Sequence, residues 1–373
     1  MANAETQQLD SIISSRRALL TLGGAALAGL AFAPRSNAQA SGATYTDTDI
    51  LNFALNLEYL EAQFYTLAAS GQTIDQLGIG LGSGTSTSTG AGSVITKSGG
   101  PTACKVAFRN SVIAAYAAEI ATEEQKHVAF LRSALGSSAV AQPQLDLYNS
   151  FNGLGQLLGL PSFDPFASDV NFLIGSYIFE DVGVTAYHGA APLITDKTNI
   201  LPAAVGIHAV EANHAGMVRL TMLGIDAGTV VVPGYAGNVA GLTLTAVTTA
   251  ISGIRTQLAQ ATATTPITDD YGLTPVTVPL NSSSSSTVVS GGPSYMAGQI
   301  FDIPLVGVAS AAATATTSAV VGNGNTPGLG YARSTAQVIA IVTAGGPTNS
   351  TTLVTTGGFY PAGLNGHFVT GLT

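Results

Sequence analysis

The feature that most constrains this chain is a repeated spacing of glutamate, tyrosine and histidine. Two Glu-x-x-His motifs occupy 124–127 and 211–214. Each follows an apolar segment that holds a glutamate and, seven residues later, a tyrosine; these pairs are Glu58 with Tyr65 and Glu180 with Tyr187. Residues i and i+3 of a helix share one face, so each motif presents a carboxylate and an imidazole together. The pattern predicts four helices that meet around one polar site.

The residue types of this site are those of a metal centre. Four carboxylates and two imidazoles from four helices form the ligand set of two-metal bundles. Charged residues make up 9% of the chain, and a bare carboxylate inside an apolar helix is costly unless it is paired or binds metal. Iron is the predicted metal and manganese the alternative, because both accept hard carboxylate and imidazole ligands. The predicted ligands of the two ions are Glu58, Glu124, His127, Glu180, Glu211 and His214.

Two tyrosines are the candidate catalytic residues. Tyr65 and Tyr187 each lie two helical turns after a predicted ligand. A tyrosine at this spacing is more often a core aromatic. Beside an oxidising metal pair it could also donate an electron or a hydrogen bond.

The roles of several neighbouring residues stay open. Glu61 shares a helix face with Glu58, and we interpret it as a partner of the ligands or as a rim residue. Glu123 could pair with His127 at i+4. His208 is favoured as a core histidine over a partner of the ligands, and Asp181 is predicted to point off the core, toward solvent or a neighbouring helix.

The apolar periodicity predicts a mainly α fold. The four predicted helices cover 46–70, 102–135, 167–190 and 199–223, with a surface loop over 78–101. The link over 137–166 joins the second and third helices, as in a four-helix bundle with one long crossover between two hairpins. The predicted bundle domain therefore spans 46–226.

The remainder, 227–373, is a C-terminal extension rich in Thr, Ala and Gly that is predicted to pack on the bundle. Its charged residues number only five. Its predicted elements are mixed: helices over 243–260 and 334–342, strand-like segments over 229–232 and 274–278, and a loop over the serine run 282–286.

The N-terminus is predicted to be an export signal over residues 1–40. Arg16 and Arg17 precede an apolar stretch that is too short for a comfortable membrane span, which needs about 20 residues. Ala38-Gln39-Ala40 fits a cleavage site. We therefore expect a prokaryotic protein that the twin-arginine route delivers to the periplasm or beyond, with no membrane span after cleavage.

Several of these segments resemble the ferritin-like superfamily. The stretch from Asn56 to Tyr65 is similar to its first helix, and 123–127 to the ligand motif of its second. More narrowly, 51–65, 124–136 and 180–189, with 333–338 and 357–366 in the tail, resemble bacterial ferritin-like proteins related to plant desiccation-related proteins. The resemblance implies the bundle fold and the metal site more directly than it implies a reaction.

Two functions fit this pattern. The first is an iron or manganese protein that consumes O₂ or peroxide, as an Fe(II) oxidase or with catalase-like turnover. The second is a structural or desiccation-protective protein whose metal site is structural or vestigial. The low charge of the extension favours surface assembly, including a homo-oligomer. A net charge of −9 argues against a nucleic-acid partner.

Overall fold

The computed structural model describes residues 45–260, 270–277, 299–302, 332–344 and 356–366. The predicted signal segment 1–40 and the serine run 282–286 lie outside these residues. Within them, no helix is both long enough and apolar enough to cross a membrane.

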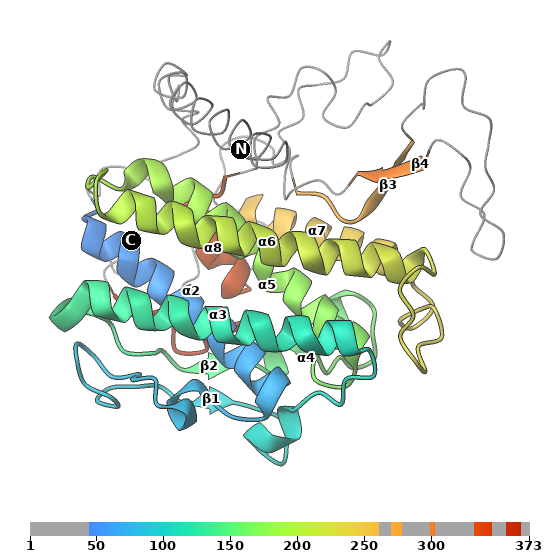
Figure 1. Ribbon diagram of the computed structural model, residues 1–373, viewed down its shortest axis with the longest axis horizontal. Coiled ribbons are helices and arrows are strands. Elements are labelled where there is room, and N and C mark those ends of the chain that lie inside the picture. The colour runs from blue at the N-terminus through green and yellow to red at the C-terminus, as the bar shows by residue number, and fades with distance from the viewer. Residues whose placement is uncertain (1–44, 261–269, 278–298, 303–331, 345–355, 367–373) are drawn as a thin grey trace, which may run out of the picture. The chain divides into compact units, whose positions relative to one another are not determined.

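Four long helices form the bundle (Figure 1). They are α2 (Asp47–Ser70), α3 (Ser111–Leu135), α5 (Asp169–Ala190) and α6 (Ile200–Asp226). Helix α2 packs along α3, α5 packs along α6, and α2 also contacts α5. The long link between α3 and α5 carries a short helix, α4 (Asn149–Leu157). This is the predicted pair of hairpins joined by one crossover.

The helix ends follow from local capping. Thr46 and Asp49 form a capping box at the start of α2, and Gly71 ends it with φ of 74°. Helix α3 begins at Ser111, so the predicted start at 102 was wrong. The side chain of Asn110 accepts the backbone N–H groups of Val112 and Ile113, which fixes the first turn there.

Short elements occupy the segments that connect the long helices. The 3₁₀ turns are η1 (Ile74–Leu77), η2 (Pro101–Cys104), η3 (Gly136–Ser138) and η4 (Ala191–Leu193). Strand β1 (Val94–Ile95) pairs in parallel with β2 (Leu145–Asp146). Arg132 of α3 donates to the carbonyls of Gly82, Gly84 and Ser86. The predicted loop over 78–101 is therefore fastened to the bundle. Cys104 is buried, as predicted for a small core residue.

The described parts of the extension pack on the bundle. Helix α7 (Leu244–Gln260) contacts α6, and α8 (Thr335–Val342) contacts both α7 and α5. Strand β3 (Thr274–Thr277) pairs antiparallel with β4 (Gln299–Asp302). The expected strand over 229–232 is absent from the structure. Helix α6 runs on through Gly224 to Asp226, and the N–H groups of Thr229 and Val230 both bond back to the Gly224 carbonyl.

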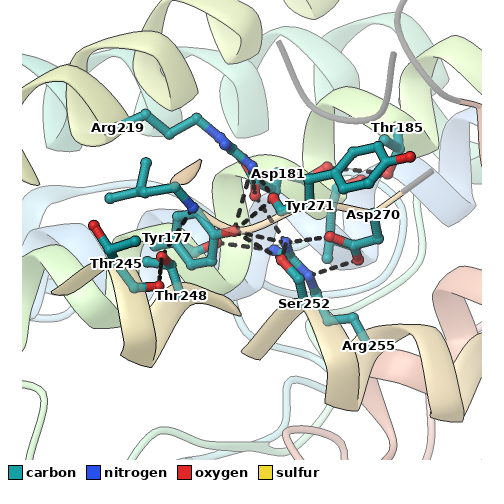
Figure 2. A network of polar contacts seen from close by, with 12 residues as sticks. Tyr177, Asp181, Thr185, Arg219, Thr245, Thr248, Ser252, Arg255, Asp270 and Tyr271 are labelled. Carbon is teal, nitrogen blue, oxygen red and sulfur yellow. Dashed lines mark hydrogen bonds and ion pairs between the residues drawn. The ribbon is translucent and has the colours of Figure 1, made fainter. Parts of the chain in front are cut away.

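A buried polar network fastens the extension to the bundle (Figure 2). Asp181 of α5 accepts hydrogen bonds from Nε and Nη2 of Arg219 at 2.9 and 2.7 Å, and from Nη2 of Arg255 at 2.8 Å. Arg255 of α7 also pairs with Asp270, 2.7 Å away, and Asp270 pairs with Arg333. The expectation that Asp181 is solvated was wrong; a helix partner, the other alternative, is what the structure shows. The side chain lies where α5 contacts both α6 and α7.

Candidate metal centre

All six predicted ligands are buried and lie close together between the four long helices. Ligand atoms of Glu58, Glu124, His127 and Glu211 lie within 4.8 Å of one another, and so do those of Glu124, Glu180 and His214. Glu124 belongs to both groups. The structure thus brings together side chains that are up to 156 positions apart in the sequence, between Glu58 and His214.

Both histidines face the carboxylates through Nδ1. Nδ1 of His127 lies 3.2 Å from Glu58, 3.4 Å from Glu124 and 3.5 Å from Glu211. Nδ1 of His214 lies 3.1 Å from Glu124 and 3.5 Å from Glu180. One carboxylate, that of Glu124, therefore lies between the two imidazoles and could bridge two ions.

Unpaired buried atoms show that these residues fit a metal. Glu124 Oε1, Glu180 Oε2, both carboxylate oxygens of Glu211, and Nδ1 of His214 are buried and make no hydrogen bond of good geometry, although Nδ1 of His214 faces the Glu124 and Glu180 oxygens at 3.1 and 3.5 Å. Buried polar atoms are normally satisfied, and each exception calls for an explanation. These five atoms gather in one place between the four helices, where coordination of cations would satisfy them.

Glu123 orients His214. Its carboxylate lies 2.7 Å from Nε2 of His214, and not against His127, the pairing that the sequence had left open. With Nε2 donating its proton to Glu123, Nδ1 of His214 is directed at the carboxylates, and its lone pair becomes available to a cation that displaces the Nδ1 proton. Metal-binding histidines commonly have such a partner on the far nitrogen. The contact crosses from α3 to α6, so the spacing within one helix could not reveal it.

The two tyrosines form a reciprocal pair of hydrogen bonds between α2 and α5. Tyr65 of α2 donates a hydrogen bond to Glu180 of α5, and Tyr187 of α5 donates one to Glu58 of α2. Burial, reinforced by these carboxylates, raises the pKa of both hydroxyls well above the usual value. Both tyrosines therefore keep their protons and act as donors. The repeat in the sequence corresponds to this reciprocal geometry.

The buried carboxylates strongly stabilise positive charge in the site, as the pKa values of its residues show. Burial alone lowers the pKa of His214, but Glu180 and Glu124 outweigh it and raise that pKa to about 12. Burial raises the pKa of Glu58 to about 7, with His127 opposing the change and Glu124 adding to it. Burial also acts to raise the pKa of Glu124, yet the neighbouring imidazoles of His127 and His214 hold that pKa at about 2. Glu124, which lies between the two imidazoles, is thus the most firmly ionised of the four predicted ligand glutamates.

Glu61 and His208, whose roles the sequence left open, lie in different surroundings. Glu61 is buried, and its pKa is raised well above the usual range by burial and then by Glu211, Glu124, Glu180 and Glu58. It therefore lies beside the ligands. His208 is half-buried and neighbours His188, with 5.9 Å between the ring centres. In the described part of the chain, neither belongs to a cluster of possible metal-binding groups.

A four-helix bundle with one long crossover and a buried carboxylate–histidine site defines the ferritin-like class. Residues 46–223 match the sequence model of the ferritin-like domain, and this part of the chain belongs to that family. No solved structure matches the chain significantly.

Two curated proteins are similar to this region. The desiccation-related protein PCC13-62 of Craterostigma plantagineum is 33% identical over 182 residues, which are 47% of this chain and 52% of the relative. The ferritin-like catalase Nec2 of Nesocodon mauritianus is 24% identical over 192 residues, 50% of this chain and 57% of the relative. The chain thus spans about half the length of each of them.

Proposed function

We propose that this protein holds two iron or manganese ions and uses them to consume O₂ or peroxide. The observation that carries the proposal is the set of unpaired oxygen and nitrogen atoms shared between two clusters through Glu124. The name of one relative, a ferritin-like catalase, supports a reaction of this class. Bound iron or manganese would supply the electron exchange with the oxidant.

The side chains around the ligands would prepare this chemistry. The hydroxyls of Tyr65 and Tyr187 orient Glu180 and Glu58, and Glu123 orients His214. Such outer partners fix the rotamers of ligands and tune their basicity. Both tyrosines are also near enough to pass a proton or an electron to the ligands that they touch, which is the role proposed for them.

Export is a second part of the proposal. The paired arginines Arg16 and Arg17 and the following apolar stretch support delivery by the twin-arginine route to the periplasm or the exterior. The buried site supports this route as well. The ligands meet only in the folded chain, so metal must be acquired after folding, and the twin-arginine route carries folded proteins.

The best test is metal analysis of the full chain after anaerobic purification, followed by addition of O₂ or H₂O₂ with optical monitoring. We expect two metal ions per chain and consumption of the oxidant. The double variant Glu124→Ala, Glu211→Ala should bind no metal and consume nothing. Less than two ions in the wild-type protein would contradict the proposal, and full occupancy in the double variant would show that the ligands are misassigned.

A structural or protective role is the second candidate. It is favoured by the desiccation-related relative and by an extension in which charged residues are rare. The same experiment separates the two functions. A protein that binds two metal ions per chain but consumes neither O₂ nor H₂O₂ would favour this role.

A further inference from the structure

A small pocket adjoins the candidate metal centre on the side of the C-terminal extension. Its lining comes from α2, α5, α8 and the 356–366 segment, and includes Leu60, Glu61, Val182, Gly183, Ile341 and Phe359. About 20 Å³ is open to the centre of a water-sized molecule, and about 10–15 Å³ is enough to hold one such molecule. The pocket therefore takes one small molecule and excludes an organic substrate.

The wall between this pocket and the ligands lacks a side chain at Gly183. A Cβ atom at this position would lie 2.4 Å from Oε2 of Glu211 and 3.3 Å from Oε1 of Glu61. Real Cβ atoms do not approach other atoms so closely, so any larger residue would displace the Glu211 carboxylate. Glycine at this position therefore lets the Glu211 carboxylate pack directly against the backbone of α5, at a residue that also lines the pocket.

The chemistry of the lining selects the occupant. Apart from Glu61, the side chains that line the pocket are aliphatic or aromatic. A water or peroxide molecule needs two to four polar partners to be held in a buried site, whereas apolar cavities stay dry and accept apolar molecules such as xenon. We propose that the pocket is a dioxygen site, which holds one O₂ beside the metal centre as substrate or as product. This inference rests on the proposed function for the fate of the O₂, but not for its binding.

Xenon is the probe for this site, because it is a small apolar atom that binds without metal or turnover. Crystals of the metal-free full chain would be pressurised with xenon, and we expect one xenon atom in contact with Leu60 and Ile341. Ile341→Phe should fill the pocket and abolish this site, while Ile341→Ala should enlarge it and raise the occupancy. Ile339→Ala, on the same helix but outside the lining, is the matched control and should leave the occupancy unchanged.

Kinetics of the metal-loaded protein provide a second measurement. Ile341→Phe should slow the reaction with O₂ several-fold while two ions remain bound, and should change the reaction with H₂O₂ less. An ordered water in the wild-type pocket, no xenon there, or equal xenon occupancy in wild type and Ile341→Phe would overturn the inference. Xenon binding in a protein that neither consumes nor releases O₂ would instead support the pocket as a gas site and overturn the proposed function.

Discussion

At the scale of single residues, Glu124 is the side chain on which both halves of the site depend. It is the member common to the two ligand clusters, it lies between the two imidazoles, and its pKa is about 2. A carboxylate in this position would couple two bound ions, because loss of its charge would remove a ligand from each of them. Glu180, by contrast, belongs to one cluster.

This difference predicts unequal stoichiometries. Glu124→Gln should lose both ions, whereas Glu180→Gln should retain the ion held by Glu58, His127 and Glu211. Metal analysis after dialysis against a defined concentration of Mn²⁺ measures this. Glu119→Gln, on the exposed side of the same helix as Glu124, is the control and should keep both ions. Equal losses in Glu124→Gln and Glu180→Gln would contradict the bridging role.

Protonation of the empty site gives a prediction for pH. The folded pKa values of Glu58, about 7, and His214, about 12, lie above their ordinary values of 4.5 and 6.5. Groups of this kind stabilise the fold below the ordinary pKa, and the stabilisation is lost as the pH rises toward the folded value. The metal-free protein should therefore lose stability between about pH 5 and pH 8.

Metal binding should have the opposite dependence, because the ions displace these protons. The rise in melting temperature on adding Mn²⁺ should be larger at the upper end of that pH range. Differential scanning fluorimetry with and without Mn²⁺ measures both trends. Glu58→Gln should flatten the slope of the metal-free protein, and an unchanged slope would show that Glu58 does not titrate there.

At the scale of elements, the contact between α5, α6 and α7 depends on buried charge. Arg255 bonds to Asp181 and Asp270, and both carboxylates are buried. Removal of one partner from a buried ion pair costs up to about 3–5 kcal/mol, and without Arg255 the buried carboxylates Asp181 and Asp270 would each keep a single arginine partner. Arg255→Met should lower the free energy of unfolding by up to about this amount, as measured by urea denaturation.

A surface ion pair supplies the control for that measurement. Lys97 and Asp164 lie 2.8 Å apart, with 20% and 28% of their side chains exposed. Pairs of this kind contribute at most about 1 kcal/mol, so Lys97→Met should have a small effect. Comparable losses in the two variants would show that the network adds little to stability.

Elements were easier to predict than the contacts between them. Local periodicity and caps located the four long helices, and the equal spacing of Glu58–Tyr65 and Glu180–Tyr187 indicated which side chains meet. Pairs formed between helices, such as Glu123 with His214, have no local signal. The burial of Asp181 was missed for the same reason: its partners lie 38 and 74 positions away.

At the scale of the whole molecule, the extension is part of the same folded body as the bundle. Arg333 donates its backbone N–H to the carbonyl of Thr185 at 3.0 Å. A Cβ at Gly189 would lie only 1.8 Å from the Arg333 carbonyl oxygen, so this close approach requires glycine. The extension reaches the other hairpin too, since the hydroxyl of Tyr360 donates to the carbonyl of Asn56 in α2.

Removal of the extension should therefore damage the bundle. A chain that ends at Ala227 would expose Asp181 and Arg219, which Arg255 and the carbonyl of Tyr271 now cover. We expect little soluble protein and no cooperative melting by circular dichroism. A chain that begins at Ser41 is the control and should melt like the full-length protein. Cooperative melting of the shortened bundle would show that the extension is dispensable for folding.

The reciprocal tyrosine–glutamate hydrogen bonds between α2 and α5 have a consequence for how the two hairpins assemble. Neither hairpin contains a complete set of ligands: the first cluster draws on α2, α3 and α6, and each tyrosine completes a glutamate on the opposite hairpin. One hairpin alone would present fewer ligands to an ion, and its glutamate would lack the tyrosine hydrogen bond that the other hairpin supplies. Bound metal would therefore indicate that the two halves have docked in register, because only the folded chain brings the ligands of both hairpins together.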